Sequence, residues 1–162
     1  EKLSYRRFEI VEKTSSQGFG AYMHMGGKIA VLVVLDKADP EIEKGLAMHI
    51  AANNPLYISI NDIPAETLAH EKTIQLELMA KDEKLAGKPE AMLAQIADRK
   101  VQKVLSESTL DQQVYLLDGE KTVGQMLKEK GNKVVKFIRY AVGEGIEKRQ
   151  DNFAEEVMSQ VK

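Results

Sequence analysis

The chain has 162 residues, which is enough for one domain with a sizeable core. Its 23 basic and 25 acidic residues leave a formal charge of −2, which argues against nucleic acid or an anionic membrane as the main partner. The absence of cysteine excludes disulfides, thiolate catalysis and cysteine zinc sites, and it suits a reducing compartment. No apolar run approaches the roughly 20 residues that span a bilayer, so no membrane association is expected.

The beginning of the chain predicts strands. Residues 3–11 have the apolar and aromatic bias of a strand, and because the chain starts inside this pattern we expect a fragment of a longer protein. Residues 20–25 and 28–35 are predicted as two strands joined across Gly26-Gly27, which is a hairpin signal. Alternation places Tyr22 and His24 on one face of the first strand. The second reads IAVLVVL and is expected to be the central, most buried strand.

A helix is predicted to begin at Asp39-Pro40. The aspartate can cap the first turn, and the missing N–H of the proline costs nothing there. The helix is expected to stop near Asn53-Asn54-Pro55, and we expect His49 at the boundary of the core. The apolar stripe comprises Ile42, Leu46, Ile50 and one of Met48 or His49.

A helical and charged stretch runs from Pro64 to about Ser108. Gly87-Lys88-Pro89 divides it, with the glycine expected to end one helix and the proline to begin the next. Two helices joined by a short turn lie antiparallel, and their narrow apolar stripes predict a hairpin that projects from the body or meets a second copy. The dimerisation or hairpin face is assigned to Leu68, Leu78, Met79, Leu93, Ile96 and Val104.

The remainder predicts a short helix and a strand. Residues 110–117 could be a short strand or an extended segment, with Asp118-Gly119 as the turn that follows. Thr122 and Gln125 form a capping box at the start of a helix, which can end at Gly131-Asn132. Further elements are a β-branched strand at 134–142, a turn at Gly143-Glu144-Gly145 and a last helix, Phe153 to Val161, capped by Asp151-Asn152.

This order of elements predicts an α+β fold: a small antiparallel sheet with helices on one face and an inserted antiparallel helical hairpin. We expect a core subdomain at 1–63 and 110–147, the hairpin insert at 64–109 and a C-terminal helical module at 148–162. Residues 1–12 are expected to be the last strand of a preceding subdomain.

Residue types that could perform chemistry are sparse. His24, His49 and His70 fall on different elements without metal-ligand spacing, so no metal or cofactor is expected, and His70 is expected to be solvated. His24 is either a contact residue or a plain exposed strand residue. One of Tyr115, Leu116 and Leu117 is expected in the core and the others in contact with a partner. The residues alone leave open a binding protein, a dimerisation scaffold and an enzyme whose pocket the sequence does not reveal.

Separate motifs, in order along the chain, resemble translation elongation factor Ts. They comprise Tyr22-x-His24 before IAVLV, Ala47 to Ala52 through Pro55, Gly87-Lys88-Pro89 within a helical hairpin, Lys121 to Gln125, and Val142 to Lys148. The resemblance implies a cytoplasmic exchange factor for elongation factor Tu, the GTPase that carries aminoacyl-tRNA. Such a factor works by binding, without covalent chemistry or a cofactor. It lowers the affinity of elongation factor Tu for nucleotide, and nucleotide lowers the affinity of elongation factor Tu for the factor to the same extent.

The resemblance also implies site residues. Contacts to the C-terminal barrel domain of elongation factor Tu fall on His24, with Tyr22 beside it, and on Leu116-Leu117. Phe153 and Val157 of the last helix are similar to a module that leans on the nucleotide-binding domain. The hairpin is similar to the dimerisation insert of the family, so a homodimer is an open expectation.

The chain departs from the family pattern in three places. A Q-P-F-V motif reads Gln113-Val114-Tyr115-Leu116 here, and E-G-R in the second hairpin arm reads Ala97-Asp98-Arg99. The N-terminal helical domain of the family and its Thr-Asp-Phe motif, whose phenylalanine disturbs the magnesium site of elongation factor Tu, are not in this sequence. We therefore expect this chain alone to bind the barrel domain weakly and to exchange nucleotide poorly.

Overall fold

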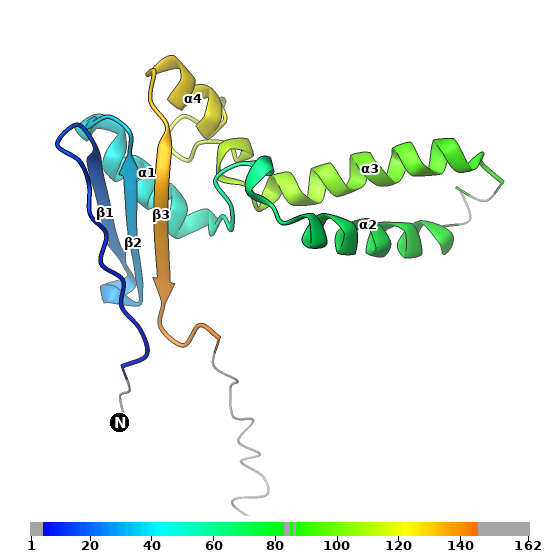
Figure 1. The fold of residues 1–162 in the computed structure, drawn as a ribbon, viewed down its shortest axis with the longest axis horizontal. Helices are drawn as coiled ribbons and strands as arrows, with labels where there is room; N and C mark the ends of the chain where they lie inside the picture. The colour runs from blue at the N-terminus through cyan, green and yellow to red at the C-terminus, as the bar shows by residue number, and fades with distance from the viewer. Residues whose placement is uncertain (1–4, 83–84, 86, 146–162) are drawn as a thin grey trace, which may run out of the picture.

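A computed structural model describes residues 5–82, 85 and 87–145 as a three-stranded antiparallel sheet with helices, from which a helical hairpin projects (Figure 1). The predicted α+β fold is confirmed. The predicted last helix, with Phe153 and Val157, lies outside the described residues.

The sheet has the order β1-β2-β3, with β1 at Gly18–His24, β2 at Ile29–Leu35 and β3 at Val134–Ala141. Both pairings are antiparallel, so β2 is the central strand, as predicted. Its side chains at Val33 and Leu35 are fully buried. The β1–β2 connection is a short 3-10 turn, η1 (Met25–Gly27), in which all three residues have positive φ. Glycine suits two of these positions because it has no Cβ to clash in that region.

One long helix, α1 (Pro40–Asn53), covers one face of the sheet. The carboxylate of Asp39 accepts a hydrogen bond from the Glu41 N–H at 3.1 Å, which confirms the predicted cap. The helix lies very close to β1, because a Cβ on Gly20 would come 2.0 Å from the Glu43 carbonyl oxygen. The shared core contains buried residues from both layers and from the segments after the hairpin: Val31, Val33, Leu35, Ile42, Leu46, Ile50, Leu110, Tyr115, Val123 and Leu127.

The hairpin consists of α2 (Ala65–Ala80) and α3 (Glu90–Glu107), which confirms the predicted insert of two antiparallel arms. The prediction that Gly87 ends the first arm is wrong, because α2 ends at Ala80. Gly87 instead supplies a left-handed residue, with φ of +79°, in the connection between the arms. The buried positions between the arms form a narrow stripe: Gln75, Met79, Ala97, Val101 and Leu105.

The two ends of the insert are tied together by backbone hydrogen bonds. The Leu56 N–H donates to the Ser108 carbonyl at 2.8 Å, and the Leu110 N–H donates to the Tyr57 carbonyl at 2.9 Å. A short turn, η2 (Ile60–Asp62), precedes α2. The hairpin therefore leaves and rejoins the body at one place.

Residues 110–117, predicted as a short strand or an extended segment, do not form a strand. Leu110–Gln112 forms a 3-10 turn, η4, and Val114 then makes an isolated bridge with Thr122. The chain reverses at Asp118-Gly119, as predicted, with φ of +78° at Gly119. The helix α4 (Val123–Glu129) follows with the predicted capping box of Thr122 and Gln125.

Residues 5–11 are not in a strand, so the prediction for this segment is wrong within the described residues. Its apolar side chains are exposed, with Phe8 69% and Ile10 78% accessible. Side chains rather than a backbone ladder hold it to β3: Arg7 stacks over Tyr140 at 4.7 Å, and Lys136 pairs with Glu9. An apolar pattern gives a strand only where a neighbouring backbone pairs with it.

A candidate partner-binding surface

Tyr22 and His24 share one face of β1, as predicted. Tyr22 is half-buried against the core, whereas His24 is exposed at the end of the strand. The Tyr22 hydroxyl lies 3.2 Å from His24 Nδ1, so the two side chains can form a hydrogen bond. The core thus fixes the tyrosine, and the tyrosine orients the histidine.

The Gln113–Thr122 loop (residues 113–122) carries the second candidate contact. Tyr115 is buried, whereas Leu116 and Leu117 are 48% and 59% exposed. This confirms the prediction that one of the three residues lies in the core. Leu116 and Leu117 are thus two adjacent exposed apolar side chains beside a buried aromatic ring.

Backbone hydrogen bonds hold this loop in one shape. The Tyr115 N–H donates to the Lys121 carbonyl at 2.8 Å, and the Val123 N–H donates to the Gln113 carbonyl at 2.9 Å. The Gly119 N–H closes the turn on the Tyr115 carbonyl at 2.9 Å. Val114, where the family pattern has proline, takes part in an isolated bridge with Thr122.

The burial of His49 and its contacts with the Gln113–Thr122 loop were not predicted from the sequence. It is completely buried rather than at the core boundary. The Leu116 N–H donates to His49 Nδ1 at 3.2 Å, and His49 Nε2 lies 2.9 Å from Gln113 Oε1. Burial lowers the pKa of His49 below its usual 6.5, and the Gln113 hydrogen bond opposes this. Helical spacing from Leu46 and Ile50 could have indicated that His49 faces inward.

The two candidate contacts lie apart on the body. The η1 turn that follows His24 is at one end of the sheet, whereas α4, which follows Leu116 and Leu117, is at the other (Figure 1). They form two separate patches. One partner that touched both would have to extend along the body.

The residues assigned to the hairpin face have different environments. Met79 is buried, Leu93 and Ile96 are half-buried, and Leu68 packs against the cluster of Ile63, Val101 and Leu105 at the base. Leu78 and Val104 are 53% and 42% exposed. Leu76, Met79 and Leu93 also line a hollow of about 220 Å³ near the far end of the hairpin.

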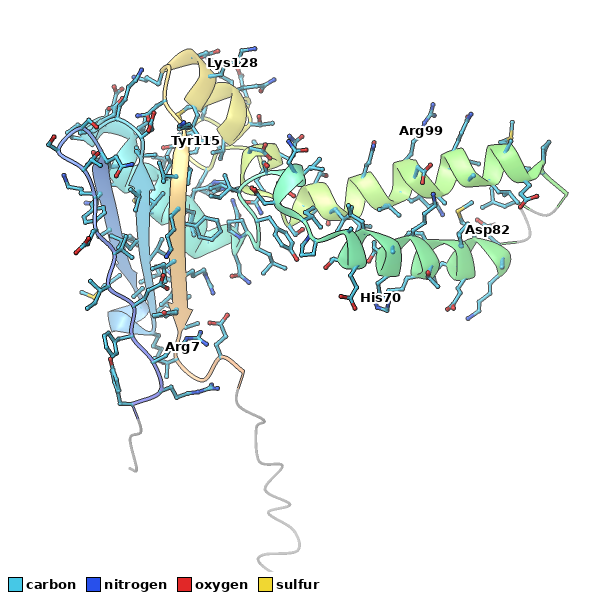
Figure 2. All side chains as sticks on the ribbon, viewed as in Figure 1. Arg7, His70, Asp82, Arg99, Tyr115 and Lys128 are labelled. Atoms are coloured by element: carbon cyan, nitrogen blue, oxygen red, sulfur yellow. The ribbon has the colours of Figure 1, made fainter. Side chains whose placement is uncertain are left out.

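Polar side chains on the hairpin face solvent. His70 and Arg99 point away from the space between the arms (Figure 2), and His70 is solvated as predicted. Among the residues that the structure describes, no group of three or more His, Cys, Asp or Glu side chains is placed to hold a metal ion. No helix within the described ranges is long and apolar enough to cross a membrane.

The described residues thus define an α+β protein that presents apolar and histidine side chains on a body with one shared core, beside a projecting helical hairpin. The family model of elongation factor TS matches residues 1–144, and the chain belongs to the elongation factor Ts family. It is 48% identical to elongation factor Ts of Lactiplantibacillus plantarum and 46% identical to that of Lacticaseibacillus casei, each over 162 residues and 100% of the chain. It is 45% identical to elongation factor Ts of Pediococcus pentosaceus over 161 residues. The chain spans about half the length of these curated relatives, 54% in each case.

Proposed function

We propose that the chain is a binding portion of a cytoplasmic guanine-nucleotide exchange factor that takes elongation factor Tu as its partner and promotes GDP release during translation elongation. The observation that carries the proposal is the match to elongation factor Ts along the whole chain, at 45–48% identity. The exposed Leu116 and Leu117 on a hydrogen-bonded loop support it, because apolar anchors on a rigid base bind at low entropic cost.

The contacts in this proposal are those expected from the family pattern. His24, oriented by Tyr22, and the leucines Leu116 and Leu117 bind the barrel domain of elongation factor Tu, and Phe153 and Val157 bind its nucleotide-binding domain. Exchange then needs no covalent step. The factor stabilises the nucleotide-free partner, so GDP and the factor weaken each other's binding by the same factor.

The proposal also assigns a different role to each part of the chain. The core subdomain (1–63 and 110–147) supplies binding, the insert (64–109) is auxiliary, and 148–162 is a separate helical module. Disturbance of the magnesium site needs a phenylalanine motif that is not in this sequence. Release of a fluorescent GDP analogue from elongation factor Tu should therefore be slow with this chain. Release as fast as with the full-length factor of a relative would refute this division.

Self-association through the hairpin is a second proposed property. Leu78 and Val104, one on each arm, leave 53% and 42% of their surface exposed and are available to a second copy. Light scattering at several concentrations tests it. The molar mass should rise with concentration and stay monomeric in the variant Leu78→Ser/Val104→Ser.

Pull-down of elongation factor Tu tests the contact residues directly. The wild-type chain should retain it, and the triple variant His24→Ala/Leu116→Ala/Leu117→Ala should lose it. The exposed Leu56 offers a matched control, since Leu56→Ala removes an apolar side chain outside both patches. Intact binding by the triple variant would contradict the assignment.

A further inference from the structure

The Gln113–Thr122 loop rests on α1 at two positions one helical turn apart, Gly45 and His49. Side chains four residues apart in a helix lie on the same face. His49 meets the loop through hydrogen bonds to Gln113 and Leu116. Gly45 meets it through the Tyr115 ring and Leu117.

The chemistry of these contacts assigns the tautomer of His49. A backbone N–H can only donate, so Nδ1, which faces the Leu116 N–H, must carry the lone pair. The Gln113 amide nitrogen donates to the Glu107 carbonyl at 2.7 Å, so its oxygen faces His49 and accepts from Nε2–H. The Asn53 amide nitrogen lies 3.1 Å from Nδ1 and 3.2 Å from Nε2, so it does not distinguish the two ring nitrogens. His49 is therefore neutral, with its proton on Nε2.

Gly45 is required for steric reasons. A Cβ on Gly45 would lie 2.2 Å from the Tyr115 hydroxyl oxygen and 2.9 Å from Leu117 Cδ1. Glycine inside a helix costs about 1 kcal/mol relative to alanine. At this position the glycine allows the loop to approach the helix backbone.

We propose that Gly45 and His49 form a positioning seat on α1 that fixes the backbone at Leu116 and thereby aims Leu116 and Leu117 at the protein partner. The inference rests on the proposed function, in which these two leucines contact elongation factor Tu. Neither seat residue touches the partner, because His49 and Gly45 are buried beneath the loop.

Protonation of His49 would break the seat. In the imidazolium both nitrogens are donors, so Nδ1 would face the Leu116 N–H donor to donor. The titratable side chain packed against the ring is Tyr115, with ring centroids 6.0 Å apart, and burial together with the charge of Glu41 raises its pKa, so it stays neutral. Because the pKa of His49 is lowered in the fold, its contribution to stability is complete above pH 6.5 and is lost as the pH falls through the folded value.

The first test compares His49→Asn with His49→Leu in affinity for elongation factor Tu. The asparagine carboxamide can place an acceptor near the position of Nδ1, whereas leucine fills similar space without one. We expect His49→Leu to lose about tenfold or more in affinity and His49→Asn to retain most of it. Val33→Ala, which removes buried methyl groups under the sheet, is the control: it should lower the melting temperature and leave the affinity unchanged. Equal affinities for the two His49 variants would overturn the inference.

A second test relieves a clash. Gly45→Ala should displace the loop and weaken binding. Adding Tyr115→Phe should restore part of the affinity, because the hydroxyl nearest the new Cβ is gone and the next ring atom lies at 3.4 Å, while Leu117 Cδ1 at 2.9 Å still has to shift. A double variant as weak as Gly45→Ala alone would contradict the steric role of Gly45.

A third measurement needs neither the partner nor a substitution. In 15N spectra of the wild-type chain, His49 should show the Nε2–H tautomer, and the Leu116 amide signal should move as the pH falls below 6.5. A wild-type chain that fails to bind elongation factor Tu would refute the proposed function but leave this readout intact. A Leu116 amide that ignores the titration of His49 would refute the seat, whatever the binding result.

Discussion

The body and the hairpin differ in how they are held together. In the body, α1, α4 and the sheet share one cluster of fourteen buried residues. At the base of the hairpin, the corresponding cluster has three buried residues, and further out the arms meet through single positions such as Gln75 and Ala97. The large core of the body can hold two leucines in fixed positions on its surface. An arm of the hairpin has few buried contacts and can open locally.

The difference in stability between the body and the hairpin should be largest when the same substitution, leucine to alanine, is made in each region. Leu46→Ala removes a fully buried side chain from the body and should lower the free energy of unfolding by about 3–5 kcal/mol. Leu105→Ala in α3 should cost about 2 kcal/mol, because the side chain belongs to a much smaller cluster. Urea denaturation measures both. A larger loss for Leu105→Ala would remove the distinction between the regions.

Glycine replacements give the next largest contrast. Gly20→Ala forces a Cβ against the Glu43 carbonyl and should cost about 2–3 kcal/mol, since backbone cannot move aside easily. Gly87→Ala has open space around it and pays only for its φ of +79°, about 1 kcal/mol. The melting temperatures of the two variants check this order, and a reversed order would contradict the close packing of α1 on β1.

Helix capping in the body should have a moderate effect. Thr122→Ala removes the side chain that accepts the Gln125 N–H at 3.2 Å and should cost about 1 kcal/mol. Thr73→Ala, in the exposed middle of α2, is the matched control and should be nearly neutral. Hydrogen exchange at the first turn of α4 should speed up only in the first variant.

The ion pair between the hairpin arms should have the smallest effect. Lys72 and Asp98 are 2.6 Å apart, but both are about half exposed, so Lys72→Ala should cost less than about 1 kcal/mol. High salt should remove the difference between variant and wild type. A cost that persists in high salt would mean that packing of the lysine stem, rather than charge, holds the arms.

Local signals in the sequence predicted much of this fold. The Asp39 cap, the Thr122–Gln125 box and the β1–β2 hairpin depend on neighbouring residues, so sequence patterns reveal them. The failed predictions depend on distant residues. Residues 5–11 carry a strand pattern but have no backbone partner among the described residues, and α2 ends at Ala80 rather than at Gly87.

In the candidate site, too, features set by neighbouring residues could be predicted and features set by distant residues could not. That one of Tyr115, Leu116 and Leu117 is buried could be predicted from their apolar run before a turn, but the run did not indicate that it is Tyr115. The role of His49 could not, because its partners Gln113 and Leu116 follow it by 64 and 67 positions in the chain. From the sequence alone, Gly45 is only a residue that weakens a helix. Its steric role follows from the structure, in which the loop packs against it.

The claim that the body rather than the hairpin binds the partner is tested most directly by the affinity for elongation factor Tu, measured by calorimetry on two variants. In one, residues 60–106 are replaced by a short Gly/Ser linker, which the backbone pairing of 56–58 with 108–111 should tolerate. In the other, the full hairpin is kept and Leu116 and Leu117 become alanine. The hairpin-less chain should bind within about threefold of wild type, and the double variant should lose about tenfold or more. Loss of binding with the hairpin, and normal binding without the leucines, would contradict the claim.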